Sequence, residues 1–188
     1  MFIQTEQTPN PKTLKFLPGK VVMSEGTAFF QNITESHNSP LAEKLFEVEG
    51  VEGVFLGSDF ITITKNNSLD WQIMKPLVLT VITDHFNSGD KTILNISDDK
   101  RKESQEDNPE DSNIVKQIKE LLNTRVRPAV AMDGGDIVYE SYKDGIVYLH
   151  MQGACSGCPS STATLKVGIE NMLKHYLPEI KEVRPVDV

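Results

Sequence analysis

The chain has 188 residues, of which 38% are hydrophobic and 24% charged, with a net charge of −8 and an isoelectric point near 5.0. This composition is typical of one or two globular domains, and its acidity argues against nucleic acid or an anionic membrane as a partner. The most apolar stretch, residues 77–82, is too short to span a bilayer. Because residues 1–6 also lack the features of a secretory signal, we expect a soluble protein of a reducing compartment.

The first part of the chain predicts a small α+β domain over residues 1–90. Its patterns predict two paired strands at 2–6 and 13–17, followed by a helix at 40–48. They then predict a hairpin with strands at 51–56 and 60–64, and a second helix at 71–86. Ser39 followed by Pro40 is typical of a helix start, with an N-cap residue and proline at the first helical position. Pro76 lies inside the pattern of the second helix and predicts a kink or a later start there.

An acidic segment follows and predicts a linker over residues 91–112. The segment from Asp98 to Asp111 contains seven acidic and three basic side chains, which gives it a net charge of −4. Proline is the only apolar side chain from Ser97 to Asn113, so this segment cannot bury a core. Repulsion between its charges should keep it extended.

The last part, residues 113–188, predicts a second α+β domain with the same coarse order of elements. A helix over 114–126 should end at Pro128, and the turn Asp133-Gly-Gly-Asp136, a turn and not a calcium loop, should lead into the first strand. The next predicted element is a hairpin with strands at 137–142 and 146–151. A helix at 159–177, which starts near Pro159, and a last strand at 180–186 complete the domain. The sequence thus predicts two small domains, each a short antiparallel or mixed sheet packed with two main helices.

The only two cysteines, Cys155 and Cys158, lie three positions apart at the start of the last helix. Such a pair can bind a metal or form a disulfide, and the helix N-terminus should lower the pKa of Cys158. Gly153 and Gly157 leave space beside the sulfurs. Because zinc sites and 4Fe-4S clusters usually take four ligands, two chains related by a two-fold axis would complete the site.

Three further interpretations of the pair stay open on the residues alone. They are a dithiol-disulfide oxidoreductase, a structural zinc module, and two buried, inert thiols. If the pair instead holds a metal cluster that is passed on, the bonds to sulfur must be accessible to incoming thiolates, which predicts an exposed cysteine loop in the apo monomer. His150 is disfavoured as a further ligand because it shares a strand face with Ile146 and Tyr148, and the other histidines, His37, His85 and His175, have no evident partner.

Beyond these patterns, the C-terminal part resembles the NifU C-terminal domain of Nfu-type iron-sulfur scaffolds. The resemblance rests on Arg-Pro-Ala-Val-Ala-Met-Asp-Gly-Gly-Asp at 127–136, Gly-Ala-Cys-Ser-Gly-Cys-Pro-Ser-Ser at 153–161, and His-Tyr-Leu-Pro at 175–178. The N-terminal part is similar to the Nfu N-terminal domain through Gln-Thr-Pro-Asn-Pro-Lys-Thr-Leu-Lys at 7–15 and Gly-Val-Phe-Leu-Gly-Ser-Asp-Phe-Ile at 53–61.

The resemblance implies a carrier protein and not an enzyme. Cys155 and Cys158 would bind a 4Fe-4S cluster, one per homodimer, with a 2Fe-2S cluster as the alternative. The expected partners are upstream cluster-assembly proteins and the recipient apo-proteins, which the N-terminal domain would help to contact. The expected location is the bacterial cytoplasm, or the mitochondrial matrix for a processed eukaryotic protein.

Overall fold

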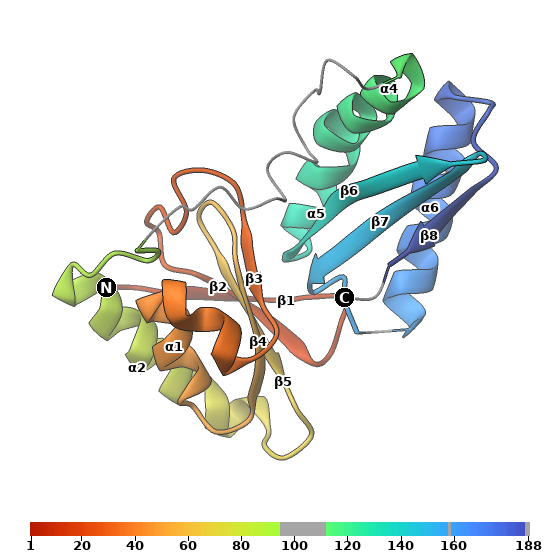
Figure 1. Ribbon diagram of the computed structural model, residues 1–188. Coiled ribbons are helices and arrows are strands. Elements are labelled where there is room, and N and C mark those ends of the chain that lie inside the picture. Colours follow the sequence, from red (N-terminus) through yellow and green to blue (C-terminus); the bar gives the residue numbers. More distant parts are fainter. Residues whose placement is uncertain (95–111, 158, 187–188) are drawn as a thin grey trace. The chain divides into compact units, whose positions relative to one another are not determined.

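A computed structural model of the chain describes residues 1–94, 112–157 and 159–186 (Figure 1). The chain forms two compact units, Met1–Ser97 and Asp98–Val188. Most of the predicted linker, residues 95–111, lies outside the described residues, so its limits stay a prediction. No helix in the described ranges combines the length and hydrophobicity needed to cross a bilayer.

The N-terminal unit contains a five-stranded antiparallel sheet with the order β1-β2-β5-β4-β3. Its strands are β1 (Gln4–Gln7), β2 (Thr13–Leu17), β3 (Ala28–Phe30), β4 (Val51–Leu56) and β5 (Ile61–Lys65). The predicted pairing of the first two strands and the predicted hairpin are both present. The sequence patterns missed β3, which is too short to show an alternation, and the 3-10 helix η1 (Ile33–Asn38) that follows it.

Two helices cover one face of this sheet. Helix α1 (Pro40–Phe46) starts as predicted, because the Oγ atom of Ser39 accepts a hydrogen bond from the N–H of Ala42 at 3.1 Å. Helix α2 (Trp71–Ser88) begins at Trp71 and continues through Pro76, so the later start is wrong. The core between the helices and the sheet is made of alternating strand residues and the apolar helix faces: Leu14, Phe16, Leu41, Leu45, Val54, Leu56, Ile61, Ile63, Val78 and Ile82.

The C-terminal unit contains a three-stranded mixed sheet and two long helical segments. Its elements in chain order are α4 (Asn113–Leu121), η2 (Leu122–Val126), α5 (Arg127–Met132), β6 (Gly135–Lys143), β7 (Ile146–Gly153), α6 (Pro159–Tyr176) and β8 (Glu182–Pro185). Strands β6 and β7 form the predicted hairpin, whose turn residues Asp144 and Gly145 both have positive φ. Strand β8 runs parallel to β7. The predicted α+β class with two small domains is confirmed.

The helix that was expected to end at Pro128 does not end there. Helix α4 continues through the π-helical turn η2 into α5, in which Pro128 is the second residue. Arg127 donates its backbone N–H to the carbonyl of Leu122, five residues earlier. Proline has no N–H to donate, and the local change to a π turn lets the chain pass it without a break.

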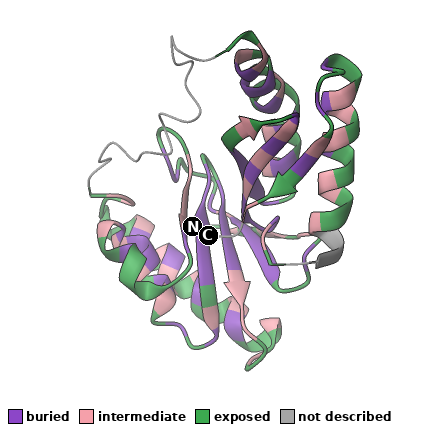
Figure 2. Ribbon diagram, turned by 45° about the vertical axis from the view of Figure 1, so that its right-hand side comes forward, coloured by how far each residue is buried: buried purple, intermediate pink, exposed green. Residues whose placement is uncertain are grey.

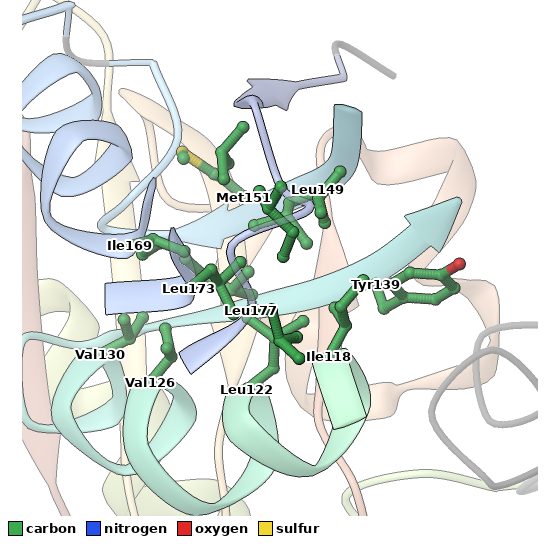
Figure 3. Packing of buried hydrophobic residues seen from close by; sticks show 14 of the residues in the cluster. Ile118, Leu122, Val126, Val130, Tyr139, Leu149, Met151, Ile169, Leu173 and Leu177 are labelled. Carbon is green, nitrogen blue, oxygen red and sulfur yellow. The ribbon is translucent and has the colours of Figure 1, made fainter. Parts of the chain in front are cut away.

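Side chains from all these elements form the core of the C-terminal unit (Figure 3). Ile118, Leu122, Val126 and Val130 point from α4, η2 and α5 toward Ile169, Leu173 and Leu177 of the α6 region, with Tyr139, Leu149 and Met151 from the strands. The apolar face of α6 contributes Ile169 and Leu173, with Leu165 and Met172 packed against them, whereas Tyr176 is 45% exposed. Figure 2 shows the same division of buried and exposed faces along the helices. Cys155 belongs to this core.

Candidate functional site

Cys155 lies in the loop between β7 and α6, where Gly153 and Gly157 both have positive φ, at 63° and 74°. Its side chain is 6% exposed. The expectation of an exposed cysteine loop is therefore wrong for Cys155, because the loop turns this side chain inward to the C-terminal core. The other predicted site residue, Cys158, lies outside the described residues, so the predicted pairing of the two sulfurs stays a prediction.

Gly135 on β6 provides the space for the Cys155 sulfur. A Cβ atom built on Gly135 would lie 2.5 Å from Sγ of Cys155 and 2.7 Å from the carbonyl oxygen of Gln152. Both distances are far below van der Waals contact, and one neighbour is backbone that cannot rotate away. Any larger residue at position 135 would therefore displace the sulfur or the end of β7.

Hydrogen bonds fix the loop on both sides of Cys155. Ala154 donates its N–H to the carbonyl of Gly134 at 3.1 Å, which ties the loop to the turn before β6. Thr162 of α6 donates its Oγ1 hydroxyl to the carbonyl of Cys155 at 3.1 Å. Ser156 donates both its N–H and its hydroxyl to the carbonyl of Gly153, at 3.1 and 2.9 Å. These hydrogen bonds thus fix the backbone before and after Cys155 to other residues of the C-terminal unit.

The surroundings of Cys155 favour the protonated thiol. Burial raises its pKa to about 12, and the negative charges of Asp133 and Asp136 act in the same direction. A thiol must lose its proton before it can act as a nucleophile or as a metal ligand. Burial and the raised pKa of Cys155 thus both disfavour its thiolate in this conformation.

Asp136, the first residue of β6 after Gly135, is buried and paired with Arg127 at the start of α5. The two hydrogen bonds are parallel: Nε of Arg127 donates to Oδ1 of Asp136 and an Nη donates to Oδ2, both at 2.8 Å. Asp136 Oδ1 also accepts the N–H of Ile137 at 2.8 Å. The carboxylate raises the pKa of Arg127 further. The sequence pattern indicated only a turn over 133–136, and the pairing of Asp136 with Arg127 is evident from the structure.

The histidines take no part in this site. His150 on β7 lies on the predicted strand face, with its Nε2 atom 2.8 Å from Oε2 of Glu140. His37 pairs with Glu43, His175 packs edge-on against Tyr176, and His85 is buried in the N-terminal unit. The described residues contain no group of three or more His, Cys, Asp or Glu placed to hold a metal ion.

Comparison with known proteins gives the family of both units. Residues 3–89 match the family model described as scaffold protein Nfu/NifU N terminal, and residues 118–184 match the NifU-like domain. Over 187 residues, 99% of this chain, it is 52% identical to "NFU1 iron-sulfur cluster scaffold homolog, mitochondrial" of Drosophila sechellia and 49% identical to the Homo sapiens protein of that name. The chain spans 65% of the length of the former and 72% of the latter.

A solved structure with a related domain is the solution NMR structure of a NifU-like protein from Saccharomyces cerevisiae. It is 30% identical, with a TM-score of 0.45, over 50% of this chain and 84% of the yeast chain. The chain belongs to the Nfu/NifU scaffold protein family, with an Nfu N-terminal domain followed by a NifU-like domain, as its sequence motifs had indicated.

Proposed function

We propose that this chain is an iron-sulfur cluster scaffold that carries a cluster on Cys155 and Cys158 and delivers it to recipient apo-proteins. The observation that carries the proposal is its 49% identity over 187 residues to a human protein named as an iron-sulfur cluster scaffold homolog. The chemistry agrees with it, because these are the only two thiols in the chain. The cluster is cargo in this role, and the chain turns over no substrate.

The number of ligands favours a shared cluster. A 4Fe-4S cluster usually takes four cysteine ligands, and each chain supplies two. Two chains about a two-fold axis would present equivalent pairs and hold one cluster between them. The loaded form is then a homodimer with one 4Fe-4S cluster, with a 2Fe-2S cluster as the alternative.

Transfer would proceed by exchange of thiolate ligands. A recipient cysteine thiol loses its proton and its sulfur forms a new bond to iron, while the iron–sulfur bond to Cys155 breaks. The released Cys155 thiolate takes up a proton, so the exchange needs neither oxidant nor reductant. The loop between β7 and α6 then buries the neutral Cys155 thiol, so Cys155 no longer competes with the recipient cysteine for iron.

The partners and location follow from the same role. Upstream cluster-assembly proteins would load the chain, recipient apo-proteins would accept the cluster, and the N-terminal domain would contribute to these contacts. The relatives are named as mitochondrial, which supports the mitochondrial matrix as the location. They offer no support for the expected bacterial cytoplasm.

Anaerobic reconstitution tests the proposal. Iron and sulfide per chain would be measured together with the mass in solution, for the unmodified chain and for Cys155→Ala and Cys158→Ala variants. We expect about four irons per two chains, a dimeric mass, and loss of the cluster in either variant. A monomer that holds a complete cluster would contradict the shared site, and a chain that binds no cluster would contradict the function.

The two alternative functions predict different results. A dithiol oxidoreductase needs a reactive thiol, whereas Cys155 is buried with a raised pKa, so we expect the metal-free chain to have no disulfide-reductase activity. A structural zinc module needs metal in order to fold. The C-terminal core is built from buried side chains of two helical segments and three strands, so we expect a cooperative melt in the presence of a chelator.

A further inference from the structure

Arg127 is connected to Cys155 by a short series of contacts within the C-terminal unit. Its guanidinium holds the buried carboxylate of Asp136 in two parallel hydrogen bonds of 2.8 Å. Asp136 follows Gly135 directly, and the Cα atom of Gly135 lies against the Cys155 sulfur. On the other side of Gly135, the carbonyl of Gly134 accepts the N–H of Ala154. The segment 133–136, here called the cover turn, therefore packs against Cys155 and is hydrogen-bonded to the residue before it, Ala154.

The guanidinium of Arg127 also bonds to a helical residue outside the cysteine loop. Its Nη1 atom donates to Oδ1 of Asn123 at 3.1 Å, so the guanidinium bridges η2 and the start of β6. Bidentate pairs of arginine and carboxylate fix orientation as well as distance, and Asp136 is 3% exposed. The ion pair thus adds to the backbone hydrogen bonds from Asp133 to Val130 and from Gly134 to Ala131 in fixing the cover turn on the helical side of the unit.

We propose that the Arg127–Asp136 pair holds the cover turn closed over Cys155, and that this closed state must open before Cys155 can bind a cluster. Arg127 is then a positioning residue, which acts on the site through Asp136 and Gly135. Loss of the pair leaves the sulfur and its backbone bonds in place but weakens the contact that keeps them covered. The significance for cluster loading depends on the function proposed above, whereas the closure itself can be measured without a cluster.

The closure is tested on the apo-protein by alkylation. In a Cys158→Ser background Cys155 is the only thiol, and its rate of reaction with iodoacetamide at pH 8 reports how often the loop opens. We expect Arg127→Gln to raise this rate roughly ten- to hundredfold, the range for loss of a pair of charge-assisted hydrogen bonds. Arg127→Lys, which keeps the charge but not the two parallel bonds, should give an intermediate rate.

A matched control separates the cover turn from general loss of stability. Lys166→Gln breaks an ion pair between α6 and β8 of the same unit, in which Nζ of Lys166 lies 3.3 Å from Oε1 of Glu182. It should leave the alkylation rate unchanged. The urea dependence provides a second control, because a local opening depends weakly on urea and global unfolding depends on it strongly. If Arg127→Gln raised the rate only in proportion to global unfolding, the closure would be ruled out.

Cluster loading provides the functional readout, with both cysteines restored. We expect the Arg127→Gln chain to take up a cluster from iron, sulfide and thiol faster than the unmodified chain, by a factor similar to that for alkylation. Equal uptake rates would overturn the role of the pair in loading. If no variant bound a cluster, the proposed function would fail, while the alkylation result would still decide whether the Arg127–Asp136 pair closes the turn.

Discussion

Gly135 and Cys155 pack so closely that no methyl group fits between them: a Cβ atom at position 135 would lie 2.5 Å from the sulfur. Gly135→Ala should therefore destabilise the C-terminal unit by about 1–3 kcal/mol, as overpacking of a core usually does. Urea unfolding measures this change. The control is Gly168→Ala on the exposed side of α6, where a Cβ would meet nothing within 4 Å. Because alanine favours a helix, this control should stabilise the chain by about 0.5–1 kcal/mol.

The raised pKa of Cys155 predicts a loss of stability at alkaline pH. In the unfolded chain the thiol titrates near its ordinary pKa of 9.0, whereas the folded thiol titrates at about 12. Above pH 9 the unfolded state therefore binds fewer protons, and the free energy of unfolding falls by up to about 1.4 kcal/mol per pH unit until the folded pKa is reached. Urea unfolding of the apo-protein at pH 8 and pH 10 measures the effect. A Cys155→Ala chain should lose less stability over this interval, and equal losses would contradict the prediction.

Buried His85 predicts the opposite dependence for the N-terminal unit. Neither ring nitrogen has a hydrogen-bond partner in the described part of the chain, and burial, aided by the charge of Lys44, lowers its pKa below 6.5. Asp90, which pairs with Lys44, acts in the other direction. Below pH 6.5 the unfolded state binds more protons, so stability should fall as the pH drops.

The fluorescence of Trp71, the only tryptophan and a residue of α2, follows this unit in the intact chain. We expect its unfolding midpoint in urea to fall between pH 7 and pH 5.5, and to fall less in a His85→Leu variant. The control is His37→Gln, because His37 is exposed and paired with Glu43. A midpoint that shifted equally in all three chains would show that His85 is not the responsible group.

Ser39 joins the start of α1 to the segment that follows α2. Its Oγ atom accepts the N–H of Ala42 and donates to the carbonyl of Thr92 at 2.7 Å. Ser39→Ala removes both bonds and should cost about 1–2 kcal/mol, near the upper end for N-cap residues. Urea unfolding followed by Trp71 fluorescence measures the cost. Thr80→Ala on the exposed face of α2, whose hydroxyl bonds only to its own helix at Pro76, should change the midpoint much less.

The sequence predicted those elements whose signals are local. Ser39 and Pro40 marked a helix start, and Asp144 with Gly145 marked a hairpin turn, because these residues favour the required backbone conformations by themselves. Strand β3 has three residues and forms only by pairing with β4, so no local pattern marked it. The family motifs likewise identified both domains from residues that stand together in the chain.

The environment of Cys155 could not be predicted in this way. Its burial depends on Gly135, which comes twenty positions earlier and is brought opposite Gly153 by the register of β6 and β7. The sequence predicted a lowered pKa for Cys158 at a helix start, whereas burial in the core and two nearby carboxylates raise the pKa of Cys155. Contacts between residues distant in the chain thus reversed an expectation that was reasonable for an open loop.

The π turn in the first helical segment of the C-terminal unit has a consequence for the length of that segment. Ile118, Leu122, Val126 and Val130 all reach one core although they recur every four residues, a spacing that drifts by about 40° per step on a regular α-helix. The wider turn η2 absorbs this drift, because a π turn accommodates one residue more than a regular α-helical turn. Deletion of Thr124 should thus leave the core residues and Arg127 in place, whereas most single deletions within a helix rotate everything beyond them.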